Sequence, residues 1–271
     1  MPVAAAIETQ QFATRHTRAL RRHLALQINR TIKSCDARAV HQVRVAIRRF
    51  TQAVAVYKPC FPAKDLRKSR RRLKKIMFAA GEVRNCDVAH KYLLRWRIPH
   101  ADRLQSKLAS RREDAARVLV AELKRWTGRP SSLKLAARQD PSETTIPEMA
   151  QRALDRIAKD FRERGNEAAS PKASPHHMHR FRIVAKKFRY TLELLQPSNP
   201  LVESIKRVST LLGDINDCVT TAAIVPPLAA RLGKRQRKKT EEFRQYWASE
   251  FQKPRKKPVA SAQASRHKSA A

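Results

Sequence analysis

One amphipathic segment occurs twice in this chain, and its repetition constrains the fold more than any other feature. The first copy, HQVRVAIRRFTQAVAVY, occupies residues 41–57, and the second, HRFRIVAKKFRY, occupies residues 179–190, which is 138 positions later (179 − 41). Both follow the form H-x-x-R-[VI]-x-x-[RK]-[RK]-F. At about 100° per residue, the histidine and the next cations share one side of a helix, and the apolar residues share the other. The sequence therefore predicts two matched helices, each with a cationic face and an apolar face.

The cationic faces define the first candidate binding residues. The first face carries His41, Arg44, Arg48 and Gln52, with Arg49 at its flank, and the second carries His179, Arg182, Lys186 and Arg189, with Lys187 in the place of Arg49. An ordinary solvated helix face is the alternative interpretation, but such faces mix acids with bases, and neither segment contains an acid before Glu193. Like charges three and four residues apart repel, so stacking them favours a bound anion.

A glycine motif follows each copy, GEVRNCDV at residues 81–88 and GDINDCV at residues 213–219. We predict that Gly81 and Gly213 each end a helix and open a turn, with Arg84 in the first turn. Such a turn is either a plain helix stop or a place where the free N–H groups of the next helix face an anion. Basic residues precede both glycines and join the candidates: Arg71, Lys74 and Lys75 before the first, Lys206 and Arg207 before the second.

The fold class follows from composition and pattern. Only five glycines occur, no segment alternates as a strand would, and Ala, Leu, Arg and Lys are abundant, so we expect an all-α protein. The repeats predict tandem duplicated four-helix bundles related by a pseudo-twofold, with a basic central groove. The expected division is a disordered N-terminus over 1–10, a first four-helix repeat over 11–127, a linker over 128–145, a second repeat over 146–252 and a disordered basic tail over 253–271.

Specific residues set the expected helix ends. Asp36 or Ser34 caps the first motif helix, and Ser174 caps the second, with Pro175 at its first position. We expect Pro99 to kink or interrupt the helix that ends near Trp126. The other expected helices span about 11–33, 64–80, 146–164 and 201–212, and a last helix from about 217 is broken at Pro226–Pro227 and reaches about 251.

The net charge is the strongest indication of what kind of molecule the protein binds. The chain has 59 Lys and Arg against 23 Asp and Glu, a formal charge of +36. Residues 253–271 contribute six cations and no acid, so +30 remains on the rest (36 − 6). Repulsion at that density opposes compaction and implies a polyanionic partner. The arginine fork binds phosphate oxygens bidentately, so a ladder of Arg and Lys suits a phosphate polymer.

The four cysteines are scattered, without a CxxC or a disulfide-rich spacing, which favours a reducing compartment. We find no signal-peptide pattern and no long apolar window, so we expect a cytoplasmic protein without a membrane segment.

The matched histidines have three interpretations. A single histidine is commonly a packing residue, whereas two in register with the cations fit a phosphate hydrogen-bond donor whose binding tightens as pH falls toward about 6. A metal site at His176, His177 and His179 is the third, but these residues spread around the helix without Cys or carboxylate partners.

Motifs for catalysis are missing from the sequence. We find no Walker A sequence, no GxSxG and no HExxH, and acids to hold magnesium are scarce near the repeats. We therefore expect a binding protein that is not an enzyme and needs no cofactor.

The doubled H-x-x-R motif and the two glycine motifs, with Arg84–Asn85 and Asn216–Asp217, resemble the CHAD domain (conserved histidine α-helical domain) over roughly residues 10–250. The resemblance implies two four-helix repeats around a basic cleft that binds inorganic polyphosphate, and a stand-alone member of the kind associated with polyphosphate granules in bacteria. Carried over by position, the ligands are His41, Arg44, Arg48, Arg49, His179, Arg182, Lys186 and Lys187, with Lys74, Lys75, Lys206 and Arg207 adding to them. Asn85 stands where the family commonly has an acid.

Two further classes stay open beside polyphosphate binding. A protein of this charge also binds nucleic acid at low salt, although the basic faces lack interleaved aromatics for base stacking. An accessory scaffold for a polyphosphate-metabolising enzyme is the other alternative, and a hydrolase is a more distant one. The oligomeric state is left open.

Overall fold

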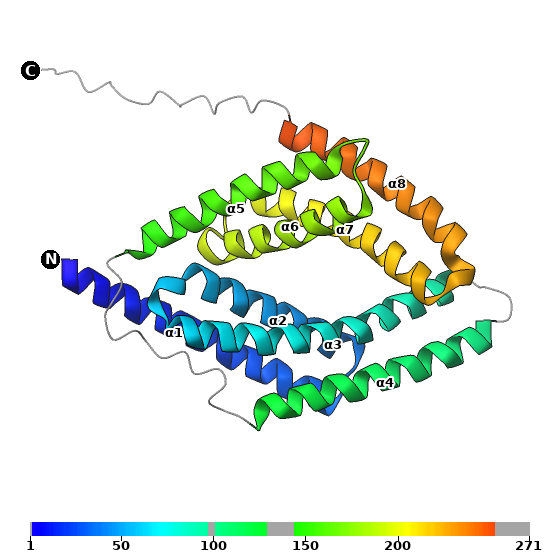
Figure 1. Ribbon diagram of the computed structural model, residues 1–271, viewed down its shortest axis with the longest axis horizontal. Coiled ribbons are helices and arrows are strands. Elements are labelled where there is room, and N and C mark those ends of the chain that lie inside the picture. The colour runs from blue at the N-terminus through cyan, green and yellow to red at the C-terminus, as the bar shows by residue number, and fades with distance from the viewer. Residues whose placement is uncertain (1, 97–100, 129–143, 253–271) are drawn as a thin grey trace, which may run out of the picture.

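The computed structural model describes residues 2–96, 101–128 and 144–252, and all regular structure in these ranges is helical (Figure 1). The eight α-helices are α1 (Pro2–Lys33), α2 (Ala37–Val56), α3 (Ala63–Trp96), α4 (Ala101–Thr127), α5 (Ile146–Ala169), α6 (Pro175–Leu195), α7 (Leu201–Ile224) and α8 (Ala229–Trp247). Short 3₁₀ turns lie at Lys58–Cys60 and Pro226–Leu228, and a π-helical turn, Ala248–Gln252, follows α8. The all-α prediction is confirmed.

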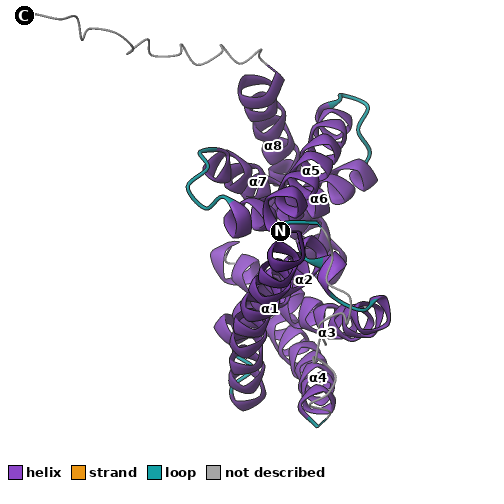
Figure 2. Ribbon diagram, turned by 90° about the vertical axis from the view of Figure 1, so that its left-hand side faces the viewer, coloured by secondary structure: helices purple, strands orange, loops and turns teal. Residues whose placement is uncertain are grey.

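The helices form two groups of four, which Figure 2 shows on opposite sides of the molecule, α1–α4 in one and α5–α8 in the other. Each group has its own apolar core. The expectation that the groups are a duplication related by a pseudo-twofold stays a prediction. No helix in the described ranges is long and apolar enough to cross a membrane.

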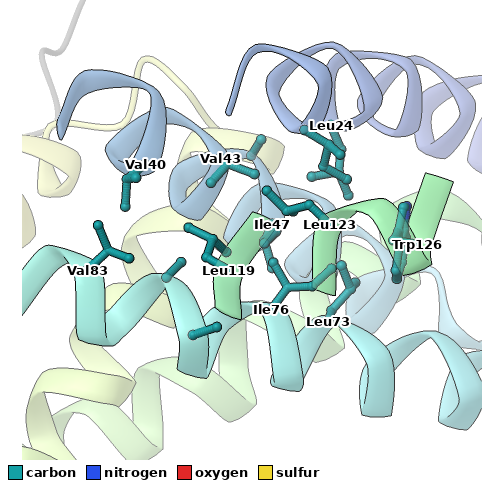
Figure 3. Close-up of a cluster of buried hydrophobic side chains, with 14 of the residues drawn as sticks. Leu24, Val40, Val43, Ile47, Leu73, Ile76, Val83, Leu119, Leu123 and Trp126 are labelled. Carbon is teal, nitrogen blue, oxygen red and sulfur yellow. The ribbon is translucent and has the colours of Figure 1, made fainter. Parts of the chain in front are cut away.

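The first core forms around the apolar face of α2. Val43, Ile47 and Phe50 are almost completely buried there, as their spacing predicts. Figure 3 shows Leu73 and Ile76 of α3 and Leu119, Leu123 and Trp126 of α4 closing over this face. Asp36 caps α2 by accepting a hydrogen bond from the Ala39 amide at 2.8 Å, which stabilises the entry of the motif helix.

The second core is richer in aromatic rings. Phe161 of α5, Phe181 of α6 and Trp247 of α8 pack with ring centroids 5.1 to 5.3 Å apart. Ser174 and His177 form the capping box of α6, with Pro175 at the first helical position, so the predicted start of this helix is confirmed.

The two groups meet through α2 against α6 and α3 against α7. Apolar clusters join them at both ends of this junction. One joins the end of α2 to the start of α5 and contains Tyr57 and Met149, and the other joins the end of α3 to the start of α8 and contains Tyr92 and Leu232. Figure 1 shows these two sets of helix ends on opposite sides of the molecule. The apolar clusters therefore hold the ends of the junction, and the charged faces of α2 and α6 lie between them.

The predicted glycine turns are wrong. Helix α3 continues through Gly81 to Trp96, and α7 continues through Gly213 to Ile224. Neither glycine has a positive φ, so neither caps a helix. Arg84 therefore lies in mid-helix, and no new helix N-terminus faces an anion there. Strong helix formers on both sides outweigh the cost of a mid-helix glycine, which is about 1 kcal/mol.

Other boundaries also differ from the expectation. Helix α1 begins at Pro2, not near residue 11, because Pro suits a first turn and the following Ala-rich segment favours helix. The helix expected over about 146–164 is longer, because α5 continues to Ala169 with Gly165 buried against Trp247. The break at Pro226 is confirmed. The predicted interruption at Pro99, most of the linker and the basic tail lie outside the described residues.

Candidate anion-binding site

A group of charged side chains from four helices lies at the junction of α2, α3, α6 and α7, and we call it the central cluster. Its members are His41, Arg44 and Arg48 of α2, Arg84 of α3, Arg182 and Lys186 of α6, and Asp217 of α7. Their charges contribute to the pKa shifts of His41, Arg44, Lys186 and Asp217, which shows that the cationic faces of the two motif helices converge. The structure thus brings together residues that are up to 176 positions apart (217 − 41).

Arg44 shows how closely the cluster is packed. Burial, followed by repulsion from Arg48 and Arg182, lowers its pKa to about 9. Its Nη1 atom donates a hydrogen bond to the Met77 carbonyl of α3 at 3.1 Å. A Cβ added at Gly81 would lie 3.4 Å from that same nitrogen. The Arg44 guanidinium therefore lies against α3 beside Gly81.

The pKa of Lys186 is shifted further from its ordinary value than that of Arg44. Burial and the nearby charges of Arg182 and Arg48 lower its pKa to about 6. Burial also lowers the pKa of Arg182, and its Nε atom is buried without a hydrogen-bond partner in the described part of the chain. Charged groups that are buried without partners are unfavourable, so both side chains would be stabilised by an anion.

Asp217 is the only carboxylate of the cluster. Burial raises its pKa, although Arg182 and Arg84 oppose this shift. One carboxylate cannot neutralise the surrounding arginines and lysine, so the cluster keeps an excess of positive charge. Sequence reasoning noted Asp217 in the second glycine motif without assigning it to the site. The two glycines are 132 positions apart (213 − 81), an offset that matches Arg84 with Asn216 (84 + 132). Asp217 is the next residue, and this position was the sequence signal that could have assigned it to the site.

The two motif histidines have different surroundings. His41 is solvent-exposed on one side, and partial burial together with Arg84 and Arg48 lowers its pKa. His179 instead lines a cavity of about 460 Å³ between α6, α7 and α8, which it shares with Arg182 and Asn216. The imidazole of His177 is hydrogen-bonded to Ser174 in the capping box of its own helix. The described ranges contain no group of three or more His, Cys, Asp or Glu that could hold a metal ion.

Several predicted site residues lie outside the cluster. Arg49 and Arg189 both pair with Glu193, at 3.6 and 3.2 Å. Lys206 pairs with Glu203 at 3.3 Å. The remaining candidates are exposed and lie outside the central cluster: Arg71, Lys74, Lys75, Lys187 and Arg207.

Residues beside the cluster fix the spacing between α2 and α6. The Gln52 amide donates a hydrogen bond to the Thr191 hydroxyl at 2.8 Å, and Arg49 reaches Glu193 across the same junction. These two contacts link α2 to α6 beside the central cluster.

Comparison with known proteins gives a consistent family assignment. The family model for the CHAD domain matches residues 13–226, which is well over half of the chain. A search of curated proteins finds no match. Among solved structures, the fold resembles the crystal structure of the CHAD domain from the plant Ricinus communis, with a TM-score of 0.57, 17% identity and 86% of each chain covered. It also resembles PptA from Streptomyces chartreusis, with a TM-score of 0.62, 17% identity, and 90% of this chain and 99% of that chain covered.

At 17% identity these two structures support the fold alone, whereas the family model covers the repeated motifs and the central cluster from His41 to Asp217. The sequence match, the helical architecture and the doubled motif agree with one another. The chain belongs to the CHAD domain family.

Proposed function

We propose that this protein binds inorganic polyphosphate at the central cluster and does not transform it. The observation that carries the proposal is an excess of partly buried positive charge, with Arg44, Arg182 and Lys186 each held at a lowered pKa. Such groups are unfavourable until an anion neutralises them. A phosphate chain presents closely spaced charges, and this arrangement suits cations drawn from several helices.

The choice of phosphate rests on the kind of cation present. Arginines dominate the cluster, and the guanidinium fork pairs with two phosphate oxygens at once. Counterion release from a polyanion would supply much of the binding free energy, by extension from nucleic acids. The resemblance to CHAD domains supports the same ligand. Association with polyphosphate granules in the cytoplasm is part of the proposal and depends on that resemblance.

The test is a paired substitution in the cluster. Arg44→Ala with Arg182→Ala should weaken polyphosphate binding by at least about 100-fold, because each lost charge-assisted contact is worth about 1.5 to 3 kcal/mol. The matched control is Arg15→Ala with Arg22→Ala, two exposed arginines of α1. Isothermal titration calorimetry gives both affinities, and thermal unfolding shows that both variants are folded.

Equal losses in the two pairs would contradict a specific site and leave only generic charge attraction. Incubation with magnesium addresses the enzyme alternative, because a shortening of the polyphosphate chain would show hydrolysis. An accessory scaffold would instead be shown by a polyphosphate-metabolising enzyme that gains activity when this protein is added.

A further inference from the structure

The exposed side of α3 continues the positive charge of the central cluster toward the N-terminal end of that helix. Four cations on it, which we call the α3 basic face, are Arg67, Arg70, Arg71 and Lys74. All four are exposed, and the helical period places them on the same side of α3 as Gly81, with Arg84 at the flank of that side. A Cβ added at Gly81 would lie 3.4 Å from the Arg44 guanidinium, so this side of α3 leads toward the central cluster.

The cations of the α3 basic face have no acidic partner in the described ranges. Other cations do pair with carboxylates within a turn, as Arg125 does with Glu122 and Arg164 with Glu167. In the described ranges no ion pair involves any residue of the α3 basic face. Unpaired like charges at this spacing repel one another, so the face is suited to an extended anion.

Helix α7, the counterpart of α3, lacks this property. Aligning the two glycines gives an offset of 132 (213 − 81), which matches Arg70 with Val202 and Arg71 with Glu203. Lys74 matches Lys206, and the ammonium of Lys206 lies 3.3 Å from the Glu203 carboxylate. The matching side of α7 is therefore close to neutral, so α7 does not continue the positive charge of the cluster as α3 does.

We infer that a polyphosphate chain bound at the central cluster extends along the α3 basic face and not along α7, so that affinity depends on chain length. This inference rests on the proposed function and goes beyond it by assigning a direction and a length dependence. Arg67 and Arg84 are 17 positions apart (84 − 67), which corresponds to roughly 26 Å of helix. A triphosphate is far shorter than this and occupies the cluster alone, whereas a long chain reaches both.

Single-stranded nucleic acid is the competing occupant of this face. The feature that favours this occupant is Phe78, which is 74% exposed beside Lys74 and could stack on a base. Nucleic-acid surfaces of this kind present successive aromatic rings, and Phe78 has no aromatic neighbour among the exposed residues of the α3 basic face. A continuous series of cations with a single ring favours a polymer without bases.

The experiment compares two ligands on three proteins. The ligands are sodium triphosphate and long-chain polyphosphate, and the proteins are the full chain, a variant with the four cations of the α3 basic face changed to Gln, and a control with four exposed arginines of α1 changed to Gln. The control residues are Arg15, Arg18, Arg22 and Arg30. The α3 variant should lose at least about tenfold in affinity for the long chain, and its slope of log K against log salt should fall by about 3, at about 0.7 per cation. Its triphosphate affinity should change by less than about twofold, and the α1 control should bind both ligands as the unchanged protein does.

A second variant tests the asymmetry by gain of affinity. Glu203→Arg frees Lys206 and places a cation where Arg71 has its match, so it should increase affinity for the long chain and leave triphosphate binding nearly unchanged.

The outcomes separate this inference from the proposed function. If neither ligand binds the unchanged protein, the proposed function is wrong. If both bind, but the α3 and α1 variants lose long-chain affinity equally, the inference is wrong and the proposed site stands. Loss of oligo(dT) binding by the α3 variant and by Phe78→Ala, with long-chain polyphosphate binding retained, would assign the face to single-stranded nucleic acid and would also overturn the inference.

Discussion

Lys186 links the binding site to proton uptake. Arg182 on its own helix, and Arg44 and Arg48 on α2, repel its proton, while Asp217 on α7 attracts it. The pKa of Lys186 is about 6 in the folded protein, against an ordinary value of 10.5. Between these values the unfolded chain holds one more proton at this residue than the folded protein does. The contribution of Lys186 to the free energy of unfolding therefore increases as pH rises through this window.

Binding of an anion should raise the pKa of Lys186, so that the complex takes up a proton near about pH 7. We predict that polyphosphate affinity falls as pH rises from about 6 to 8 and that Lys186→Met removes most of this proton uptake. The same variant should unfold at a higher temperature without ligand near neutral pH, because folding no longer removes a proton from a buried lysine. Calorimetry in buffers of different ionisation enthalpy measures the protons, and identical uptake by both proteins would contradict the role of Lys186.

Single residues also show where sequence reasoning reached its limit. The helical period placed Arg44, Arg48 and Arg182 on the cationic faces correctly, because it depends only on local geometry. Arg49 and Arg189 were included for the same reason, but they pair with Glu193. Which flank of a cationic face turns toward a neighbouring acid depends on how α2 docks on α6, and a helical period carries no information about docking.

At the scale of helices, three mid-helix glycines have different surroundings. A Cβ added at Gly81 would be in ordinary contact with Arg44, Gly165 allows Trp247 to pack on α5, and Gly213 has no atom within 4 Å of an added Cβ. Sequence reasoning interpreted the first and third as helix stops and ended the expected helix before the second, because mid-helix and terminal glycines look alike without a partner helix. The caps at Asp36 and Ser174 were predictable, because a cap depends on residues adjacent in the chain.

Substitution of these glycines by alanine should have opposite effects. At Gly165 an added Cβ would lie 2.0 Å from the Trp247 ring, so Gly165→Ala should destabilise the protein by about 1 to 3 kcal/mol through overpacking. Gly213→Ala meets nothing and should stabilise it by about 0.5 to 1 kcal/mol through helix propensity. Urea unfolding measures both changes, and destabilisation of similar size at the two positions would refute the assignment of Gly165 to a packing contact.

At the scale of the whole molecule, apolar clusters hold the two ends of the junction, and like charges face each other between them. Composition predicted an all-helical protein, which the structure confirms, and the polyanionic partner that it implies stays a prediction. The asymmetry between α3 and α7 was not predicted, because alignment of the motifs drew attention to what the repeats share. Repulsion among these partly buried like charges lowers the stability of the free protein, and a bound polyanion would relieve it.

The central claim is that this partly buried charge is selective for a phosphate chain and is not merely a positive surface. Competition at about 0.3 M salt tests it most directly, because salt screens exposed charges more than partly buried ones. Labelled long-chain polyphosphate bound to the protein would be displaced by unlabelled polyphosphate, duplex DNA or RNA. We predict that only polyphosphate competes well per phosphate. Equal competition by DNA or RNA would contradict the claim and identify the protein as a general binder of nucleic acids and other polyanions.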